Sequence, residues 1–202
     1  MEGIMFYWIC WMYWIFLTFI VEKINRYRFS LSIVVLIIII LSNTHFRVMG
    51  NEIYASGVFL LAISYYLIGR QRTGAIIYFF ICSFIVTIAY VTFLLFEIFD
   101  PIWIVFKKEW MMGIGFTILA LLLQKNLLGR LLIIISGTMQ GEILFAYILS
   151  RYPFPYSIGS PAYLDVCFLI SALLVGWCTL ENAGSFFGNH ANFFGKVKQK
   201  SS

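Results

Sequence analysis

The chain has 202 residues, of which 62% are hydrophobic and only 11% are charged, and its formal net charge is +5. A soluble domain is nearer half apolar and a quarter charged, and a fold of this size has too little interior to bury so much apolar surface. The composition therefore excludes a soluble enzyme or binding domain and predicts a protein embedded in a lipid bilayer. The basic residues lie in small groups at the ends of apolar runs, which is typical of helix orientation at a membrane and argues against a nucleic-acid partner.

Seven apolar runs follow one another along the chain, separated by short polar gaps. An apolar helix needs about 20 residues to cross the hydrocarbon core, and the runs lack the alternation of polar and apolar residues that a barrel strand would show. We therefore predict an all-α, polytopic transmembrane helix bundle of about seven spans, in which residues 1–180 form one helical domain and residues 181–202 form a short basic cytoplasmic tail. The predicted helices are Ile4–Val21, Phe29–Thr44, Ile53–Gly69, Thr73–Phe96, Trp110–Gln124, Leu131–Ser150 and Tyr163–Leu180.

Gaps with more basic residues alternate along the chain with gaps that have fewer, and this alternation predicts the orientation of the helices. The positive-inside rule places the gaps with more Lys and Arg in the cytoplasm. We therefore predict that the amino terminus lies outside and the carboxyl terminus inside. The inner set has ten members, Lys23, Arg26, Arg28, Arg70, Arg72, Lys125, Arg130, Lys196, Lys198 and Lys200, and the outer set has four, Arg47, Lys107, Lys108 and Arg151.

The fifth run is the shortest. Trp110–Gln124 would be about 22 Å long at 1.5 Å per residue, against a hydrocarbon core of about 30 Å, so the sequence leaves open whether it fully crosses. If it did not, the later gaps would change sides, and roughly six basic residues would lie inside against eight outside, contrary to the positive-inside rule. The charge distribution therefore favours seven crossings.

The sixth run carries the acid that lies deepest in any predicted span. Glu142 is eight residues from the outer end of its run, which places it about 12 Å deep. A charged carboxylate at that depth costs at least about 2.5–3.5 kcal/mol, and the sequence places no Lys or Arg at comparable depth. We therefore expect Glu142 to hold a proton for much of the time or to face a wet cavity.

Small residues predict which faces of the last two helices pack together. Gly137 and Gly141 form a GxxxG pair beside the deep acid, and Asp165, Ala172 and Gly176 recur on one face of the seventh run. Small residues allow helix backbones to approach closely in a membrane. We therefore predict that the sixth and seventh helices pack together through these faces.

Two interpretations of the intramembrane polar residues remain open. In the first, Gln140, Glu142 and Asp165 line a path for protons or cations, because such a path needs acids that can load and release a proton. In the second, they form hydrogen bonds between helices, worth about 0.6–2 kcal/mol each, that fix the helix register. The sequence alone gives the second interpretation somewhat more weight.

The sequence predicts no catalytic residue, no metal site and no cofactor. His45 lies in a loop and His190 in the tail, so no span offers a histidine ligand or base. The four cysteines lie inside apolar runs without a CxxC pair. The HExxH and GxSxG motifs are absent, and no lysine within a span could form a retinal-type Schiff base. We therefore expect no enzymatic activity.

Three segments of the chain are similar to one known family. They are Met1–Trp8 (MEGIMFYW), Phe96–Pro101 (FEIFDP) and Gly137–Glu142 (GTMQGE), and together they resemble, nearly end to end, the YphA-like family of small bacterial membrane proteins. The resemblance implies a multi-pass protein of the bacterial plasma membrane. It assigns no catalytic or ligand-binding residue.

The sequence thus leads to one expected function and one alternative. We expect a protein without enzymatic activity that acts in the lipid bilayer through association with other membrane proteins or with copies of itself. The alternative is a small proton- or cation-coupled transporter or channel subunit that uses Glu142.

Overall fold

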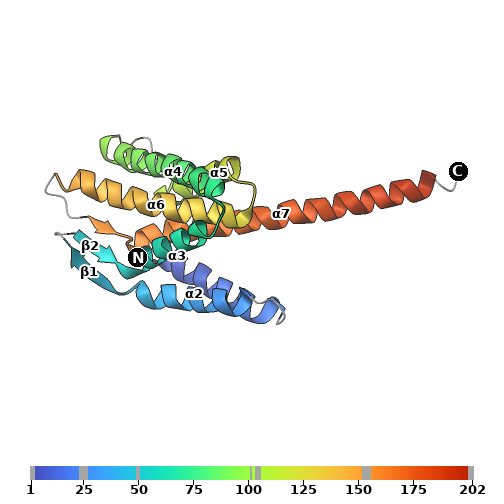
Figure 1. Cartoon of the computed structure of the whole chain (residues 1–202), viewed down its shortest axis with the longest axis horizontal. Coiled ribbons are helices and arrows are strands. Elements are labelled where there is room, and N and C mark those ends of the chain that lie inside the picture. The colour runs from blue at the N-terminus through green and yellow to red at the C-terminus, as the bar shows by residue number, and fades with distance from the viewer. Residues whose placement is uncertain are drawn as a thin grey trace.

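Helices make up most of the structure, a computed structural model that describes residues 3–22, 27–48, 51–100, 102, 106–151 and 156–199 (Figure 1). Each helix lies on one of the predicted apolar runs, which confirms the expected helical architecture. The helices are α1 (Ile4–Ile15), with a short π-helical continuation η1 (Phe16–Ile20), α2 (Tyr27–Leu41), α3 (Ala55–Gly69), α4 (Thr73–Phe99), α5 (Lys108–Leu123), α6 (Leu127–Leu149) and α7 (Pro161–Gln199).

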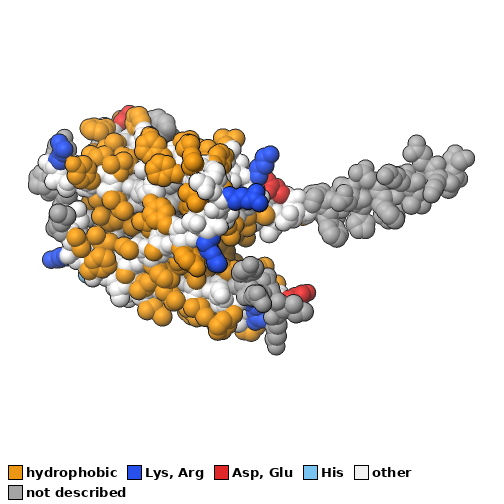
Figure 2. All heavy atoms as spheres, in the orientation of Figure 1, with side chains coloured by type: hydrophobic (Ala, Val, Ile, Leu, Met, Phe, Trp, Pro, Cys, Tyr) orange, Lys and Arg blue, Asp and Glu red, His pale blue; other side chains and the backbone are white. Residues whose placement is uncertain are grey.

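Among the residues that the structure describes, three helices are long and apolar enough to cross a membrane, namely α4, α6 and the Pro161–Ala183 part of α7. The apolar helices Ile4–Ile20, Arg28–Leu41 and Ala55–Gly69 are shorter. Hydrophobic side chains cover most of the face seen in Figure 2, and charged side chains lie toward its two ends. This distribution matches an apolar belt between two polar interfaces.

Several helix ends differ from the predicted ones, and those of α5 and α7 matter most for the site. α5 begins at Lys108 and not at Trp110, which gives it 16 residues and a length of about 24 Å. α7 begins at Pro161, a residue suited to the first helical position because proline has no N–H to leave unpaired, and it continues without a break past Leu180 to Gln199. The start predicted for the basic tail therefore falls within a helix.

A small three-stranded sheet lies at one end of the bundle (Figure 1), where the sequence predicted loops and, at Ile53 and Tyr54, the start of the third helix. Strand β1 (His45–Val48) pairs antiparallel with β2 (Asn51–Tyr54), and β2 pairs parallel with β3 (Ser157–Ile158). The strands are rich in the aromatic and β-branched residues that favour extended backbone. The sheet therefore joins the connection between α2 and α3 to the start of α7.

The closest helix packing occurs between α4 and α6. A Cβ atom on Gly137 would lie 2.6 Å from the Val86 side chain and 2.8 Å from the carbonyl oxygen of Ser83, and one on Gly141 would lie 2.6 Å from the Tyr90 ring. These two glycines therefore let the α4 and α6 backbones approach closely.

The partner of this glycine face differs from the predicted one, since Gly137 and Gly141 pack on α4 and not on α7. α7 packs mainly against α5 and α1. Ala172 is half-buried, whereas Gly176 is exposed and no atom lies within 4 Å of the position its Cβ would take. The physical reason is that Val86 and Tyr90, spaced like the two glycines by one helical turn, supply the complementary ridge on α4.

Candidate functional site

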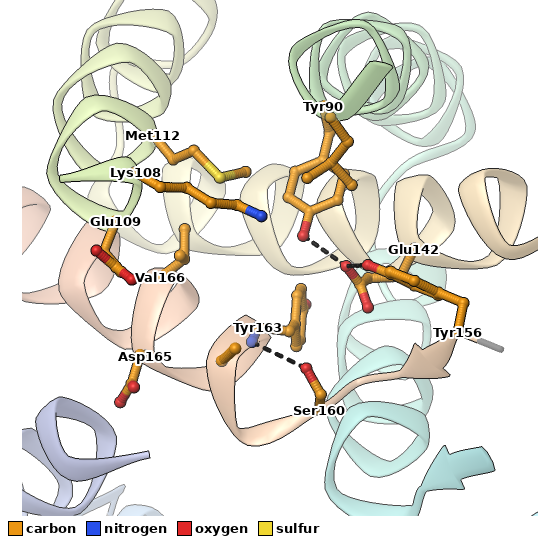
Figure 3. Close-up of a pocket in the computed structure, with 12 residues that line it drawn as sticks. Tyr90, Lys108, Glu109, Met112, Glu142, Tyr156, Ser160, Tyr163, Asp165 and Val166 are labelled. Carbon is orange, nitrogen blue, oxygen red and sulfur yellow. Dashed lines mark hydrogen bonds between the residues drawn. The ribbon is translucent and has the colours of Figure 1, made fainter. Parts of the chain in front are cut away.

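Glu142 is almost completely buried, with 1% of its surface exposed, and both oxygens of its carboxylate accept hydrogen bonds from the protein. Oε1 accepts hydrogen bonds from the Tyr90 hydroxyl at 2.6 Å and the Tyr156 hydroxyl at 2.7 Å, and Oε2 accepts one from the Gly159 backbone N–H at 3.1 Å. Figure 3 shows the two phenols converging on the carboxylate. Glu142 therefore connects α6 to α4 and to the segment that leads into α7.

Gly159 contributes its N–H from a turn that favours glycine. Its φ is +69°, in the left-handed region that other residues rarely adopt. Its Cα also lies close to Gly57, where a Cβ would come within 3.1 Å of it. A glycine therefore allows the chain to turn from β3 into α7 while directing an amide at the buried acid.

A cavity of about 400 Å³ lies beside Glu142, and its polar lining includes Tyr90, Lys108, Glu109 and Ser160 (Figure 3). Lys108 extends from the first turn of α5 into this cavity, and its Nζ lies 2.6 Å from Glu97 Oε2. The sequence placed no Lys or Arg at the depth of Glu142, and Lys108, whose side chain is 37% exposed, reaches the same cavity from a helix end. The long, flexible lysine stem allows this reach.

Asp165 is buried, lines the same cavity as Glu142 and joins α7 to the start of α1. Its Oδ2 accepts the Gly3 N–H and its Oδ1 accepts the Phe6 N–H, both at 2.7 Å. Figure 3 shows the carboxylate turned away from Glu142. Asp165 therefore caps the start of α1 from α7 and supplies a negative charge where the helix dipole favours one. Gly3 itself has no side chain to do so.

Gln140 lies on another face of α6 from Glu142, because two residues correspond to about 200° around a helix. Its Nε2 donates to the Tyr65 hydroxyl at 2.7 Å and to Ser83 Oγ at 3.2 Å, and its Oε1 accepts from the Thr87 hydroxyl at 3.2 Å. These bonds connect α6 to α3 and α4. Glu142 and Asp165 thus line one cavity, whereas Gln140 lies outside it, and each of the three makes its own hydrogen bonds between helices or segments.

The sequence reasoning did not identify the tyrosines around the acid. Tyr90 and Tyr163 are buried within apolar runs, and Tyr163 shares a hydrogen bond with the Thr138 hydroxyl at 3.1 Å. Burial, and then the nearby Glu142 carboxylate, raise the pKa of the Tyr156 phenol, which keeps it protonated as a donor. A signal in the sequence was the presence of tyrosine inside a span, where a buried hydroxyl needs a partner.

Metal binding finds no support in the described part of the chain, where no group of three or more His, Cys, Asp or Glu side chains could hold an ion. The cysteines Cys10, Cys82, Cys167 and Cys178 are all free.

Apolar helices long enough to cross a bilayer are typical of an integral membrane protein. The chain belongs to the YphA-like integral membrane protein family, whose model matches residues 2–200. It is similar to the "Uncharacterized protein YphA" of Bacillus subtilis (strain 168), with 27% identity over 202 residues and 100% of both chains covered. No solved structure matches the chain significantly. The family predicted from the three sequence segments is thereby confirmed.

Proposed function

We propose that the chain is a non-enzymatic protein of the bacterial plasma membrane that crosses the bilayer seven times, with its amino terminus outside, and acts by associating with other membrane components. The positions of the helix ends support this topology. Gly3 and Asp165 join the starts of α1 and α7, and Glu97 and Lys108 join the end of α4 to the start of α5. The sheet connects the end of α2 to the starts of α3 and α7. All these connections belong to gaps with few basic residues, so this end is the outer one in the proposal.

The observation that carries the proposal is the set of three hydrogen bonds that Glu142 accepts from its own chain. A carboxylate that accepts three hydrogen bonds from three parts of its own chain holds those parts together. A carrier of protons or cations would have to exchange some of these partners in each cycle. The geometry therefore supports a structural role for Glu142, whose hydrogen bonds fix the segments of the outer end relative to one another.

The sheet offers a surface through which such a protein can associate. β1 is an edge strand whose four residues are all exposed, including Phe46 at 45% and Val48 at 44%. The free edge of a strand presents N–H and C=O groups that pair readily with an extended segment of another chain. The proposed partner contact is therefore at β1.

A photo-crosslinking residue at Phe46 tests this contact in intact membranes. We expect it to form a discrete crosslinked product with another membrane protein or a second copy of the chain, and the same residue at Leu122, an 80% exposed position in α5, to give none. Val48→Lys should abolish the product, because a charged residue on an edge strand opposes strand addition. Absence of a product, or one that Val48→Lys leaves unchanged, would contradict association through β1.

One observation favours the alternative of proton or cation transport, namely the polar cavity that reaches Glu142 and contains Lys108. Reconstituted liposomes separate the two functions. The proposal predicts no proton or cation flux above that of empty liposomes. A flux that Glu142→Gln removes at an unchanged protein level would instead establish the transporter.

A further inference from the structure

A second cavity, of about 400 Å³, shares no lining residue with the cavity beside Glu142. It lies between the end of the first helical segment and the start of α2, and its wall is mainly apolar. The residues that line it are Trp14, Thr18, Arg28, Phe29, Ser32, Ile33 and Leu36. It thus combines an apolar groove with one cationic side chain.

Arg28 has a defined position at the end of this groove. Its Nε donates to the Leu17 carbonyl at 2.8 Å and one terminal nitrogen donates to the Thr18 carbonyl. These carbonyls belong to the π-helical segment η1, which ends at Ile20. The last carbonyls of a helix lack partners within the helix, and these bonds fix the guanidinium against them. Two of its five N–H donors serve this purpose, and an arginine can bind a phosphate with the others.

Hydroxyl groups lie on the same wall. Thr18 Oγ1 and Ser32 Oγ are 3.5 Å apart, one on η1 and the other on α2. Hydroxyl donors beside a guanidinium are suited to the oxygens of a phosphodiester.

The groove has the chemistry of both parts of a phospholipid. Ile33 is exposed, and Trp14 and Leu36 are half-buried, so the apolar wall continues along α2 away from Arg28. We propose that the groove binds an anionic phospholipid, with its phosphate at Arg28 and one acyl chain along this wall. The charge complementarity between Arg28 and the phosphate identifies the occupant, and the site is independent of the association proposed at β1.

Native mass spectrometry of the full-length chain in detergent tests the site directly. Phosphatidylglycerol and phosphatidylcholine with identical acyl chains are titrated separately. We expect tighter binding of phosphatidylglycerol, and we expect Arg28→Gln to reduce this preference about fivefold, since a basic residue near an anionic headgroup contributes about 1 kcal/mol. Arg70→Gln is the matched control. Arg70 lies over the Tyr66 ring, 5.5 Å from its centroid, in a gap of the same basic set, and its loss should leave the preference unchanged.

A second variant keeps the test decisive if Arg28→Gln does not accumulate. Ser32→Trp fills the groove from α2 and retains the guanidinium, and it should reduce the binding of phosphatidylglycerol at least fivefold. Three results would overturn the proposal. They are equal binding of the two lipids, equal losses in Arg28→Gln and Arg70→Gln, and unchanged lipid binding in Ser32→Trp.

Discussion

Gly137→Leu is expected to lower the free energy of unfolding by at least about 2 kcal/mol and to reduce the amount of protein in the membrane sharply. Even a Cβ atom at this position would come within 2.8 Å of the Ser83 carbonyl oxygen, which is backbone and cannot turn aside. Overpacking of a close contact typically costs about 1–3 kcal/mol and sometimes more. The change would also separate the Thr87 hydroxyl from the Gly137 carbonyl, to which it donates at 3.0 Å.

Thermal unfolding in detergent and the amount in purified membranes measure this effect. Gly115→Leu is the matched control, because Gly115 also lies inside a helix but has no atom within 4 Å of its Cβ position. This control should be at least as stable as the parent chain, since leucine favours a helix more than glycine does. Similar stability of the two variants would contradict the tight packing of α4 on α6.

Glu142→Leu should destabilise the protein by about 3 kcal/mol or more. The change leaves the hydroxyls of Tyr90 and Tyr156 and the N–H of Gly159 without their acceptor. Each buried donor that loses its partner costs about 1–3 kcal/mol. The loss should appear as a lower midpoint of thermal unfolding and as a detached outer end, visible as faster hydrogen exchange around residues 156–160.

Two milder variants define the mechanism of this loss. Tyr156→Phe removes one of the three hydrogen bonds and keeps the ring packed against Phe145, so it should cost about 1 kcal/mol. Glu142→Gln retains one acceptor oxygen and should lie between Tyr156→Phe and Glu142→Leu. If Glu142→Leu proved as stable as the parent chain, that result would contradict the claim that the hydrogen bonds of Glu142 stabilise the outer end.

The helices could be predicted from the sequence because the bilayer imposes one requirement on every residue of a span. An unbroken run such as Ile33–Leu41 is apolar on all sides, and only a helix pairs its backbone groups internally. No comparable requirement predicts the sheet. Its strands have two to four residues, and β3 pairs with β2 across about a hundred residues of chain. A segment that short does not specify a distant partner by its pattern.

The depth of Glu142 identified it as important, but its partners depended on contacts that no spacing reveals. The GxxxG pair of Gly137 and Gly141 predicted close packing, although the choice between α7 and α4 required the matching side chains of Val86 and Tyr90. Lys108 was assigned to an outer loop, because sequence position alone does not show how far a lysine stem reaches. Local residue types thus predicted the packing face of α6 but not that of α7, and tertiary packing determined the partner of each.

The proposed seven crossings are tested most directly by the labelling of single cysteines in intact cells with a membrane-impermeant maleimide. The chain should carry Cys178→Ser, since Cys10, Cys82 and Cys167 are buried. Cysteines at the exposed positions Asn43 and Phe106 should react from outside, whereas those at Gln71 and Lys125 should react only after the membrane is opened. Reaction of both Phe106→Cys and Lys125→Cys from outside would show that α5 does not cross and would contradict the seven-span topology.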